Sequence, residues 1–397
     1  MPNNSARVHT PWGDTGPGPY LRVDREPLPR AFIGRALGCA GLLAAGVAHA
    51  QPLAFSNTTG GSVSFYGQLS PIYLGFDDGA KTFQSAADNN ISNSLVGFYL
   101  GQSVGAKTEV QLHFETSLGA QQSSDLSQDG SSSWTAEKDD LRFLEIIVSG
   151  GLGRLFAGQG SMTTDGVPQM DLSGTLIAGY VEREDTAGSY RFRDRSGVLS
   201  DVSIGNAFND YNGPRRFRLR YDTPSFHGLS LAVSYGVDVL DESDDHRSAD
   251  VALSWADVIG DLKIAAAAGQ IWIDGSDNER RTEWRMGSIS VLHQPAGLSI
   301  TLAAGAEPGG GAYGYGKLGL ITSLLSVGDT AVSVDYLGGE DYSSTGSASR
   351  SWGVEGVQTI DSLNLEAYAA WVSYAYNDKL ASYKIASSIV VGMRWSF

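Results

Sequence analysis

Three arginines stand at alternate positions in the segment RRFRLRYDTP, at Arg216, Arg218 and Arg220. Alternate side chains of an extended chain share one face, so the three guanidinium groups lie on the same side as Asp222. Fixed charges of one sign on one face set up an electric field that can orient ions and polar solutes. The plainer alternative is that these arginines are paired with carboxylates and only keep a water-filled interior soluble.

Carboxylates gather in the connection that precedes these arginines, which runs from about Gly160 to Pro214. It is by far the longest connection in the chain, and one of this length without clear secondary structure is usually functional or disordered. Apolar residues such as Met170 and Tyr180 can anchor it, which favours function over a solvated external loop. The candidate acidic residues are Asp165, Asp171, Glu182, Glu184 and Asp185.

No arrangement of residues for bond-breaking chemistry is recognisable. Beyond residue 50 the chain has four histidines, and none lies in a hydrolase or metalloprotease motif. The single Cys39 excludes a paired-cysteine metal site. His113 alone on its strand is more typical of a wall residue than of a general base. An enzyme is therefore a remote alternative.

The elements that must position these charges are strands. Past Gln51, segments of about ten residues with period-two alternation follow one another between turns, and almost nothing has helical periodicity. Connections alternate between short turns such as Ile259-Gly260-Asp261 and long polar loops. We expect sixteen strands, which begin near Ser62, Ser92, Ala106, Leu141, Arg154, Arg215, Ser230, Arg247, Leu262, Arg281, Leu298, Tyr313, Thr330, Arg350, Leu363 and Ile385.

An even number of strands with tight turns at one end and long loops at the other predicts an all-β fold, a transmembrane antiparallel up-and-down β-barrel. Alternation alone cannot say which face of a strand meets lipid. The closing segment IVVGMRWSF helps, because it ends on Phe397 with large apolar residues at every second position. On this parity the pore-lining candidates are Glu109, His113, Glu115 and Arg394.

The amino-terminal segment has the features of a secretory signal. An apolar stretch of about a dozen residues ends in Ala48-His49-Ala50, so we expect residues 1–50 to be an extension plus a cleaved signal peptide, and 51–397 to be the barrel domain. Lipid attachment at Cys39 is a less favoured alternative. The formal net charge of −16 argues against nucleic acid as a partner.

Several segments in this order resemble one family. They are VSFYGQLSPIYLGFDDG, LVGFYLGQSVGAKTEVQLHFETS, LEIIVSGGLGRLFAGQ, RLRYDTPSFHGLSLAVSYG and the terminal aromatic residue. Over residues 61–397 the chain resembles the general diffusion porins of Gram-negative outer membranes, in their sixteen-stranded trimeric form. One departure is Gln102-Ser103, where family members often carry an acidic pair in the first periplasmic turn.

The resemblance implies a mechanism and partners. The long third loop would fold into the lumen and press its carboxylates toward Arg216, Arg218 and Arg220, forming a constriction with a transverse field. The family also implies a homotrimer in outer-membrane lipid and lipopolysaccharide, and a barrel-assembly machinery that reads Phe397. No cofactor is expected, although loosely bound calcium near Asp77 or Asp274 is an open alternative. A substrate-specific channel for sugar, phosphate or amino acid, and a secreted soluble β protein, are the remaining alternatives.

Overall fold

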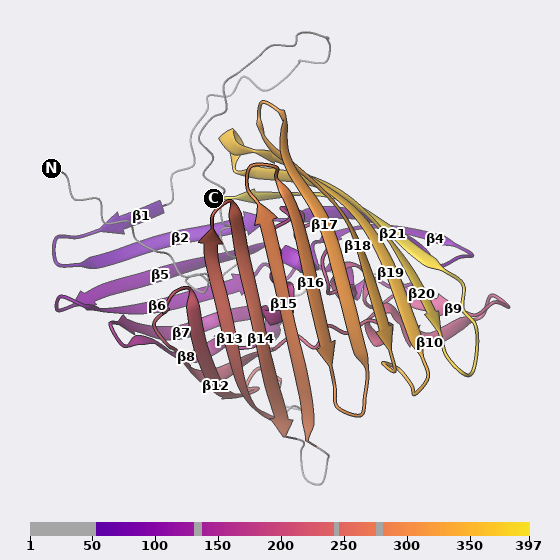
Figure 1. The fold of residues 1–397 in the computed structure, drawn as a ribbon, viewed down its shortest axis with the longest axis horizontal. Helices are drawn as coiled ribbons and strands as arrows, with labels where there is room; N and C mark the ends of the chain where they lie inside the picture. Colours follow the sequence, from indigo (N-terminus) through magenta and orange to yellow (C-terminus); the bar gives the residue numbers. More distant parts are fainter. Residues whose placement is uncertain (1–52, 131–136, 242–245, 275–280) are drawn as a thin grey trace.

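The computed structural model describes residues 53–130, 137–241, 246–274 and 281–397. The predicted boundary at residue 50 lies outside the described residues, so the division into signal and barrel stays a prediction. Within the described residues the chain is almost entirely β-structure around one closed sheet (Figure 1).

The barrel has sixteen antiparallel strands, as predicted. β2 and β3 are two halves of the first barrel strand, and β4 and β5 are two halves of the second. The sheet has 19 strands because these halves are separate and because a short β1 pairs with β2. Its strands are β1 (Leu53–Ser56), β2 (Gly61–Leu69), β3 (Pro71–Asp77), β4 (Thr82–Asp88), β5 (Leu95–Val104), β6 (Thr108–Ser117), β7 (Leu141–Gly150), β8 (Gly153–Ser161), β11 (Arg215–Asp222), β12 (Leu229–Val237), β13 (Arg247–Ile259), β14 (Leu262–Asp274), β15 (Thr282–His293), β16 (Leu298–Ala306), β17 (Ala312–Leu325), β18 (Gly328–Glu340), β19 (Ala348–Ile360), β20 (Leu365–Asn377) and β21 (Ala386–Ser396).

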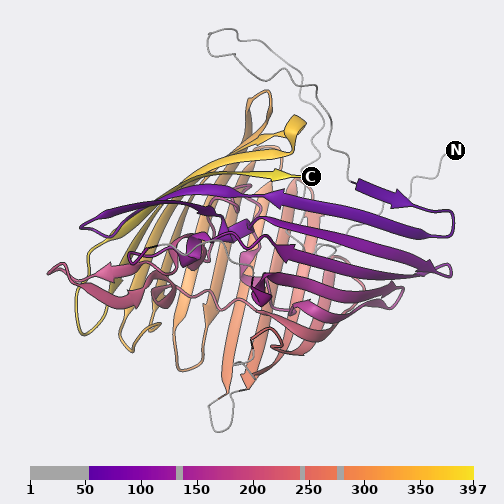
Figure 2. The ribbon, with the colours of Figure 1, turned by 180° about the vertical axis from the view of Figure 1, so that it is seen from behind.

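Each barrel strand pairs with its neighbours in sequence order, and β21 closes the ring. It pairs with β20 on one side and with β2 and β3 on the other, where Leu69 is opposite Trp395. The first strands, indigo to magenta, form the wall that faces the viewer in Figure 2, behind the orange strands of Figure 1. β1 was not predicted; it pairs with the half of β2 that extends beyond the end of β21.

The two faces of the barrel differ sharply in chemistry. On β11 the side chain of Leu219 is 56% exposed, whereas that of the next residue, Arg220, is 2% exposed. The same alternation holds on the other walls, where the outward side chains are large and apolar, as with Ile289 and Val354. A soluble protein would bury these groups. An apolar exterior around a polar interior is the arrangement that suits a bilayer.

The connections alternate in length around the barrel. One end has tight turns, such as the two-residue link between β13 and β14, where Gly260 has φ +61°. That left-handed conformation favours glycine. The other end has the longer loops, and one of them contains the short 3-10 turns η2 (Ser123–Asp125) and η3 (Lys138–Asp140). Two further 3-10 turns lie elsewhere: η1 (Asn90–Ser92) is between the two halves of the second barrel strand, and η5 (Asp361–Leu363) is between β19 and β20. No helix among the described residues is long and apolar enough to cross a membrane.

The third loop, between β8 and β11, folds into the barrel. Its apolar residues, among them Ile177, Phe192 and Ile204, are buried against inward side chains of the wall such as Tyr374. The sequence suggested no secondary structure here, but the loop contains short elements. They are η4 (Val167–Gln169), α1 (Glu184–Ala187), β9 (Arg191–Arg193), β10 (Leu199–Ser203) and α2 (Ile204–Ala207).

Candidate functional site

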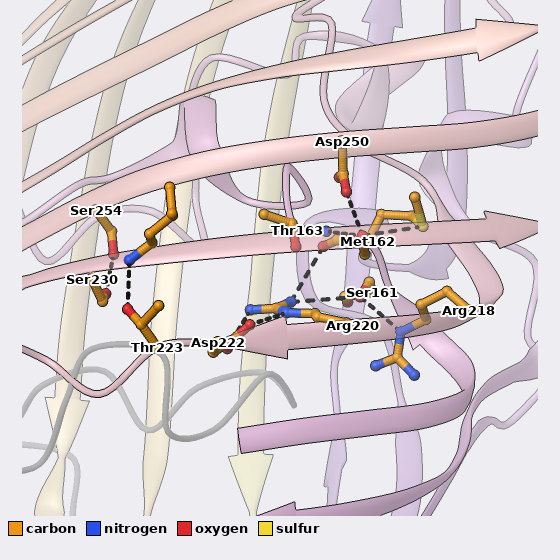
Figure 3. Close-up of polar contacts among 12 residues, drawn as sticks. Ser161, Met162, Thr163, Arg218, Arg220, Asp222, Thr223, Ser230, Asp250 and Ser254 are labelled. Carbon is orange, nitrogen blue, oxygen red and sulfur yellow. Dashed lines mark hydrogen bonds and ion pairs between the residues drawn. The ribbon is translucent and has the colours of Figure 1, made fainter. Parts of the chain in front are cut away.

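The three arginines of β11 all point into the barrel, on the face predicted from their spacing. Arg218 forms an ion pair with Glu145 of β7 and donates to the carbonyl oxygen of Gly158 at 2.9 Å. Arg220 binds both carboxylate oxygens of Asp222, at 2.8 and 2.9 Å (Figure 3). Arg216 forms an ion pair at 2.6 Å with Asp238, which follows the last residue of β12.

Glu145 also connects this wall to the predicted pore-lining residues of β6. His113 lies 2.9 Å from Glu145 through Nδ1 and 2.7 Å from the hydroxyl of Tyr66 through Nε2. The same hydroxyl donates to Glu115, which forms an ion pair with Arg142 of β7. His113 and Glu115 are buried, and each has hydrogen-bond partners within one continuous polar network. These contacts offset the cost of burying polar side chains in the wall.

The remaining pore-lining candidates also point inward. The amide of Gln111 donates to Glu109 at 3.2 Å. Arg394 of β21 binds Glu366 of β20 at 2.6 Å and Ser92 at 2.9 Å, close to the closure of the barrel. Whether these side chains line the path of a solute stays a prediction.

The third loop follows the inner wall strand by strand. It leaves β8, passes along the inward side chains of β12, β13, β15 and β18, and contacts β19 before it returns to β11. Serine and aspartate side chains on those strands hold it. The hydrogen bonds join Thr163 to Ser234, Thr164 to Asp250, Met170 to Ser288, Leu172 to Ser290, Thr175 to Ser333, and Ser349 to Ala207.

Two buried ion pairs fasten the middle of the loop to the wall. Asp171 accepts from Nζ of Lys317 on β17 at 2.9 Å, and the same ammonium group donates to the carbonyl oxygen of Gly179 at 2.7 Å. Arg183 forms an ion pair with Asp335 of β18. Buried charges persist only when paired and hydrogen-bonded, so these contacts fix where the loop lies.

Three of the predicted loop acids come together. Tyr180 is hydrogen-bonded to both Glu182 and Asp185, and Glu184 is their neighbour at the start of α1. Asp210, which the sequence pattern did not single out, joins this group from the returning part of the loop. We call Glu182, Glu184, Asp185 and Asp210 the acidic cluster.

Burial dominates the chemistry of the acidic cluster. It raises the pKa of Glu182, Glu184 and Asp185 well above the ordinary value, and repulsion from neighbouring carboxylates raises each pKa further. Burial likewise raises the pKa of Asp210 to about 7. Protonated carboxyl groups can donate hydrogen bonds to one another, which accounts for the close packing of these acidic side chains.

The other two predicted acids lie elsewhere. Asp171 is at Lys317, as described above, and Asp165 contacts Asn212 within the loop. Asp165 is close enough to Arg142 of β7 for their charges to interact. The hydrogen bonds and ion pairs given above for Arg216, Arg218 and Arg220 involve none of the five predicted loop acids. The joint role of these acids and arginines in a constriction therefore stays a prediction.

Sequence reasoning missed the residues that hold the predicted ones. Lys317, Asp335 and Glu145 each occupy inward positions of an alternating strand, and that parity was the available signal. Asp210 had no such signal, because only the fold of the loop brings it beside Glu182.

The carboxylates at the two places where calcium binding was an alternative have other contacts. The carboxylate of Asp77 accepts from the backbone of Gly79 at 2.7 Å, and Asp78 forms an ion pair with Arg193 at 2.7 Å. Asp274 lies 3.3 Å from Arg281, beside residues that are not described. In the described ranges, no group of three or more histidine, cysteine, aspartate or glutamate side chains could hold a metal ion.

The carboxy-terminal residue lies at the barrel closure. Phe397 exchanges two backbone hydrogen bonds with Gly67 of β2, at 3.0 and 3.1 Å, and its ring packs against Trp395. The side chain is 40% exposed on the outer face. The predicted apolar face of β21 is confirmed; a role as an assembly signal stays a prediction.

A closed sixteen-stranded barrel with an apolar exterior, tight turns at one end and an inward third loop defines the porin class of membrane barrel. The Gram-negative porin family matches residues 36–382 of this sequence. The chain belongs to that family, as the resemblance predicted. No curated protein matches it by sequence.

Solved porin structures share its fold. The anion-selective porin from Comamonas acidovorans has a TM-score of 0.54 and 14% identity, with 85% of this chain and 100% of that one covered. OmpF of Salmonella typhi, in complex with daunomycin, has a TM-score of 0.53 and 11% identity, with 86% of this chain and 99% of that one covered. In-vitro folded OmpT of Vibrio cholerae, in its trimer form, has a TM-score of 0.52 and 13% identity, with 85% of this chain and 99% of that one covered. At these identities the likeness concerns the fold alone.

Proposed function

We propose that this protein is an outer-membrane porin that forms a water-filled channel for passive diffusion of small hydrophilic solutes and ions. The observation that carries the proposal is the reversal of the usual faces, with apolar side chains outside and ion pairs such as Arg218 with Glu145 inside. Membership of the Gram-negative porin family supports the outer membrane as its location. It also supports a channel rather than an enzyme.

The constriction is proposed to lie where the third loop faces the basic wall. Arg216, Arg218 and Arg220 would supply the positive side, with the loop acids Asp165, Asp171, Glu182, Glu184 and Asp185 on the opposite side. Support comes from the loop's ion pairs with the wall and from the proximity of Asp165 to Arg142. Burial raises the pKa of Glu182, Glu184 and Asp185 and so favours their neutral forms.

The assembly is proposed to be a homotrimer embedded in outer-membrane lipid and lipopolysaccharide. The support is family membership and the trimer form named for the Vibrio cholerae relative in structure. Insertion is proposed to depend on the barrel-assembly machinery, with Phe397 as the recognised residue. The support is that Phe397 exchanges backbone hydrogen bonds with Gly67 where the sheet closes.

Liposome swelling tests the channel directly. Liposomes that contain the purified protein should swell in isotonic neutral sugars, at rates that fall as the sugar becomes larger. Heat-denatured protein is the control. Swelling no faster than that of protein-free liposomes would refute the proposed function.

The constriction has a separate test with a matched control. We expect the combined change of Arg216, Arg218 and Arg220 to glutamine to shift the reversal potential in a salt gradient toward cation preference. The control changes Arg247, Arg285 and Arg350, three exposed arginines that are not on the inner face, to glutamine. An unchanged reversal potential in the first variant would remove these arginines from the constriction.

A further inference from the structure

Two of the three arginines predicted for the constriction are shielded from the lumen. Arg218 and Arg220 are 3% and 2% exposed, and carboxylates of the wall hold both guanidinium groups (Figure 3). The third, Arg216, is paired with Asp238 at 2.6 Å. A buried, ion-paired guanidinium group is not available to a passing solute. The side chains that contact a solute must therefore lie elsewhere on the same wall.

Arg142, near the start of β7, is a more accessible arginine of this wall. Its Nε donates to Glu115, and its Nη1 donates to the side chain of Asn93 at 3.0 Å. Its side chain is 17% exposed, whereas the carboxylate of Glu115 is fully buried. Nη2 has no hydrogen-bond partner among the described residues. The guanidinium group is thus fixed on one side and open to water on the other.

Arg215, the first residue of β11, lies beside Arg142. The two guanidinium groups are close enough to repel each other. That of Arg215 lies over the ring of Phe143, 5.9 Å from its centre, and this ring is on the inner face. Arg215 is half-buried, and no carboxylate in the described ranges forms an ion pair with it. Its charge is therefore available to a solute.

The third loop brings one carboxylate near this pair. Asp165 is half-buried, accepts from the side chain of Asn212 at 3.4 Å, and interacts electrostatically with Arg142. Within the part of the chain that the structure describes, no ion pair joins Asp165 to Arg142 or Arg215. Opposite charges that attract each other without contact, on partly exposed side chains, are separated by water or by a solute.

The balance of charge at this point favours an anion. Glu115 is the other carboxylate beside Arg142, but it is buried and also accepts from the hydroxyl of Tyr66. Water in the lumen therefore meets two guanidinium groups and the one carboxylate of Asp165. Guanidinium groups bind carboxylate and phosphate oxygens through paired N–H donors.

We propose that Arg215, with Arg142 beside it, is the element of the channel that contacts permeating anions, and that Asp165 faces it from the third loop. This inference rests on the proposed diffusion channel and adds the residues that set its charge selectivity. The solute class that the element favours is small anions, including those with a carboxylate or phosphate group. The buried row at Arg218 and Arg220 contributes only together with its partner carboxylates.

Ion selectivity in planar bilayers is the first test. In a potassium chloride gradient, Arg215→Gln should lower the permeability ratio of chloride to potassium about fivefold or more, the change expected when one unit charge about 4 Å from an ion in water is lost. The variant should fold, because Arg215 has no ion pair to lose. Asp165→Asn should raise the ratio, and its amide oxygen can still accept from Asn212.

Arg350→Gln is the matched control, because it removes the same charge from the outer face. Its permeability ratio should equal that of wild type. An unchanged ratio in Arg215→Gln, or an equal shift in Arg350→Gln, would overturn the proposal.

Restoration of the charge separates solute contact from a structural role. The sequence has one cysteine, so Arg215→Cys is made in a Cys39→Ser background. A methanethiosulfonate reagent that carries an ammonium group should react from water and return the permeability ratio toward that of wild type. A neutral reagent of similar size should not. A thiol that does not react in the folded protein, or a labelled protein with an unchanged ratio, would contradict the proposal.

The same recordings distinguish this inference from the channel itself. Conductance in wild type together with a shifted ratio in Arg215→Gln supports both. Conductance in wild type without that shift overturns the role of Arg215 and leaves the porin. Absence of conductance in wild type overturns both, because selectivity requires a channel.

Discussion

Removal of the charge on Lys317 should detach the middle of the third loop from the wall. Its ammonium group is fully buried and bonds to Asp171 at 2.9 Å and to the carbonyl oxygen of Gly179 at 2.7 Å. Glu355 and Asp335 are also close enough to interact with it. Lys317→Met keeps the length of the side chain and removes its charge from all three carboxylates, which leaves Arg183 beside Asp335 and Glu355.

The size of the effect follows from the burial of the pair. Loss of one partner of a buried ion pair costs about 3–5 kcal/mol. We take about 4 kcal/mol as the loss of free energy that holds the loop on the wall. Because every 1.4 kcal/mol is tenfold, the equilibrium constant for opening of the loop should rise roughly a thousandfold. The double variant Lys317→Met, Asp171→Asn removes both charges and should restore most of the lost stability of the docked loop. The amide oxygen of an asparagine at position 171 can still accept from the backbone of Ser173, as Asp171 does.

Hydrogen exchange measures the opening of the loop. The amides of Ala178 and Gly179, bonded to the carbonyl oxygen of Thr175, should exchange about a thousand times faster in Lys317→Met if exchange follows local opening. Amides of β13 and β14 should not change. Lys107→Met, in an exposed turn, is the control. Less than a threefold change at the loop, or no recovery in the double variant, would refute the anchoring role.

Three further predictions follow from local features. Burial raises the pKa of Asp210 to about 7, whereas in the unfolded chain this carboxyl group loses its proton at about pH 4. The folded state therefore holds a proton that the unfolded state has released, and the melting temperature should fall as pH rises from about 4 to about 7. Asp210→Asn should reduce this dependence on pH. Gly158 has φ +131° and an added Cβ would lie 2.3 Å from the carbonyl oxygen of Leu144, so Gly158→Ala should cost about 1–3 kcal/mol or more, whereas Gly356→Ala, with open space around it, should be tolerated. Deletion of Phe397 should lower the yield of heat-modifiable folded trimer in outer-membrane fractions, and Phe397→Tyr should retain it; normal yield after the deletion would refute the assembly signal.

The barrel was predictable because its signals are local. Period-two alternation and the contrast of short turns with long loops are properties of neighbouring residues, and they placed fifteen of the sixteen strand starts within two residues of those observed. The second strand was wrong: it begins at Thr82 with β4, in a stretch that its polar composition made look like a loop, ten residues before the predicted start at Ser92. The face of each side chain followed from parity, as with Arg220 inside and Leu219 outside. β1 was missed because four residues are too few to show a period.

The contacts of the site were not predictable in the same way. Parity puts Arg218 inside, but its pairing with Glu145 depends on how β7, β8 and β11 are staggered. The position of Asp210 depends on the path of a loop with no periodicity. Such contacts join residues far apart in the sequence, and only the assembled barrel brings them together.

Single-channel recording of the purified protein in a planar bilayer is the most direct test of the proposed channel. We expect discrete upward steps of conductance in potassium chloride, which continue without any added energy source. We also expect a reversal potential that moves toward cation preference when Arg216, Arg218 and Arg220 are neutralised. Insertion of folded protein without any conductance step would show that the protein is not a diffusion channel.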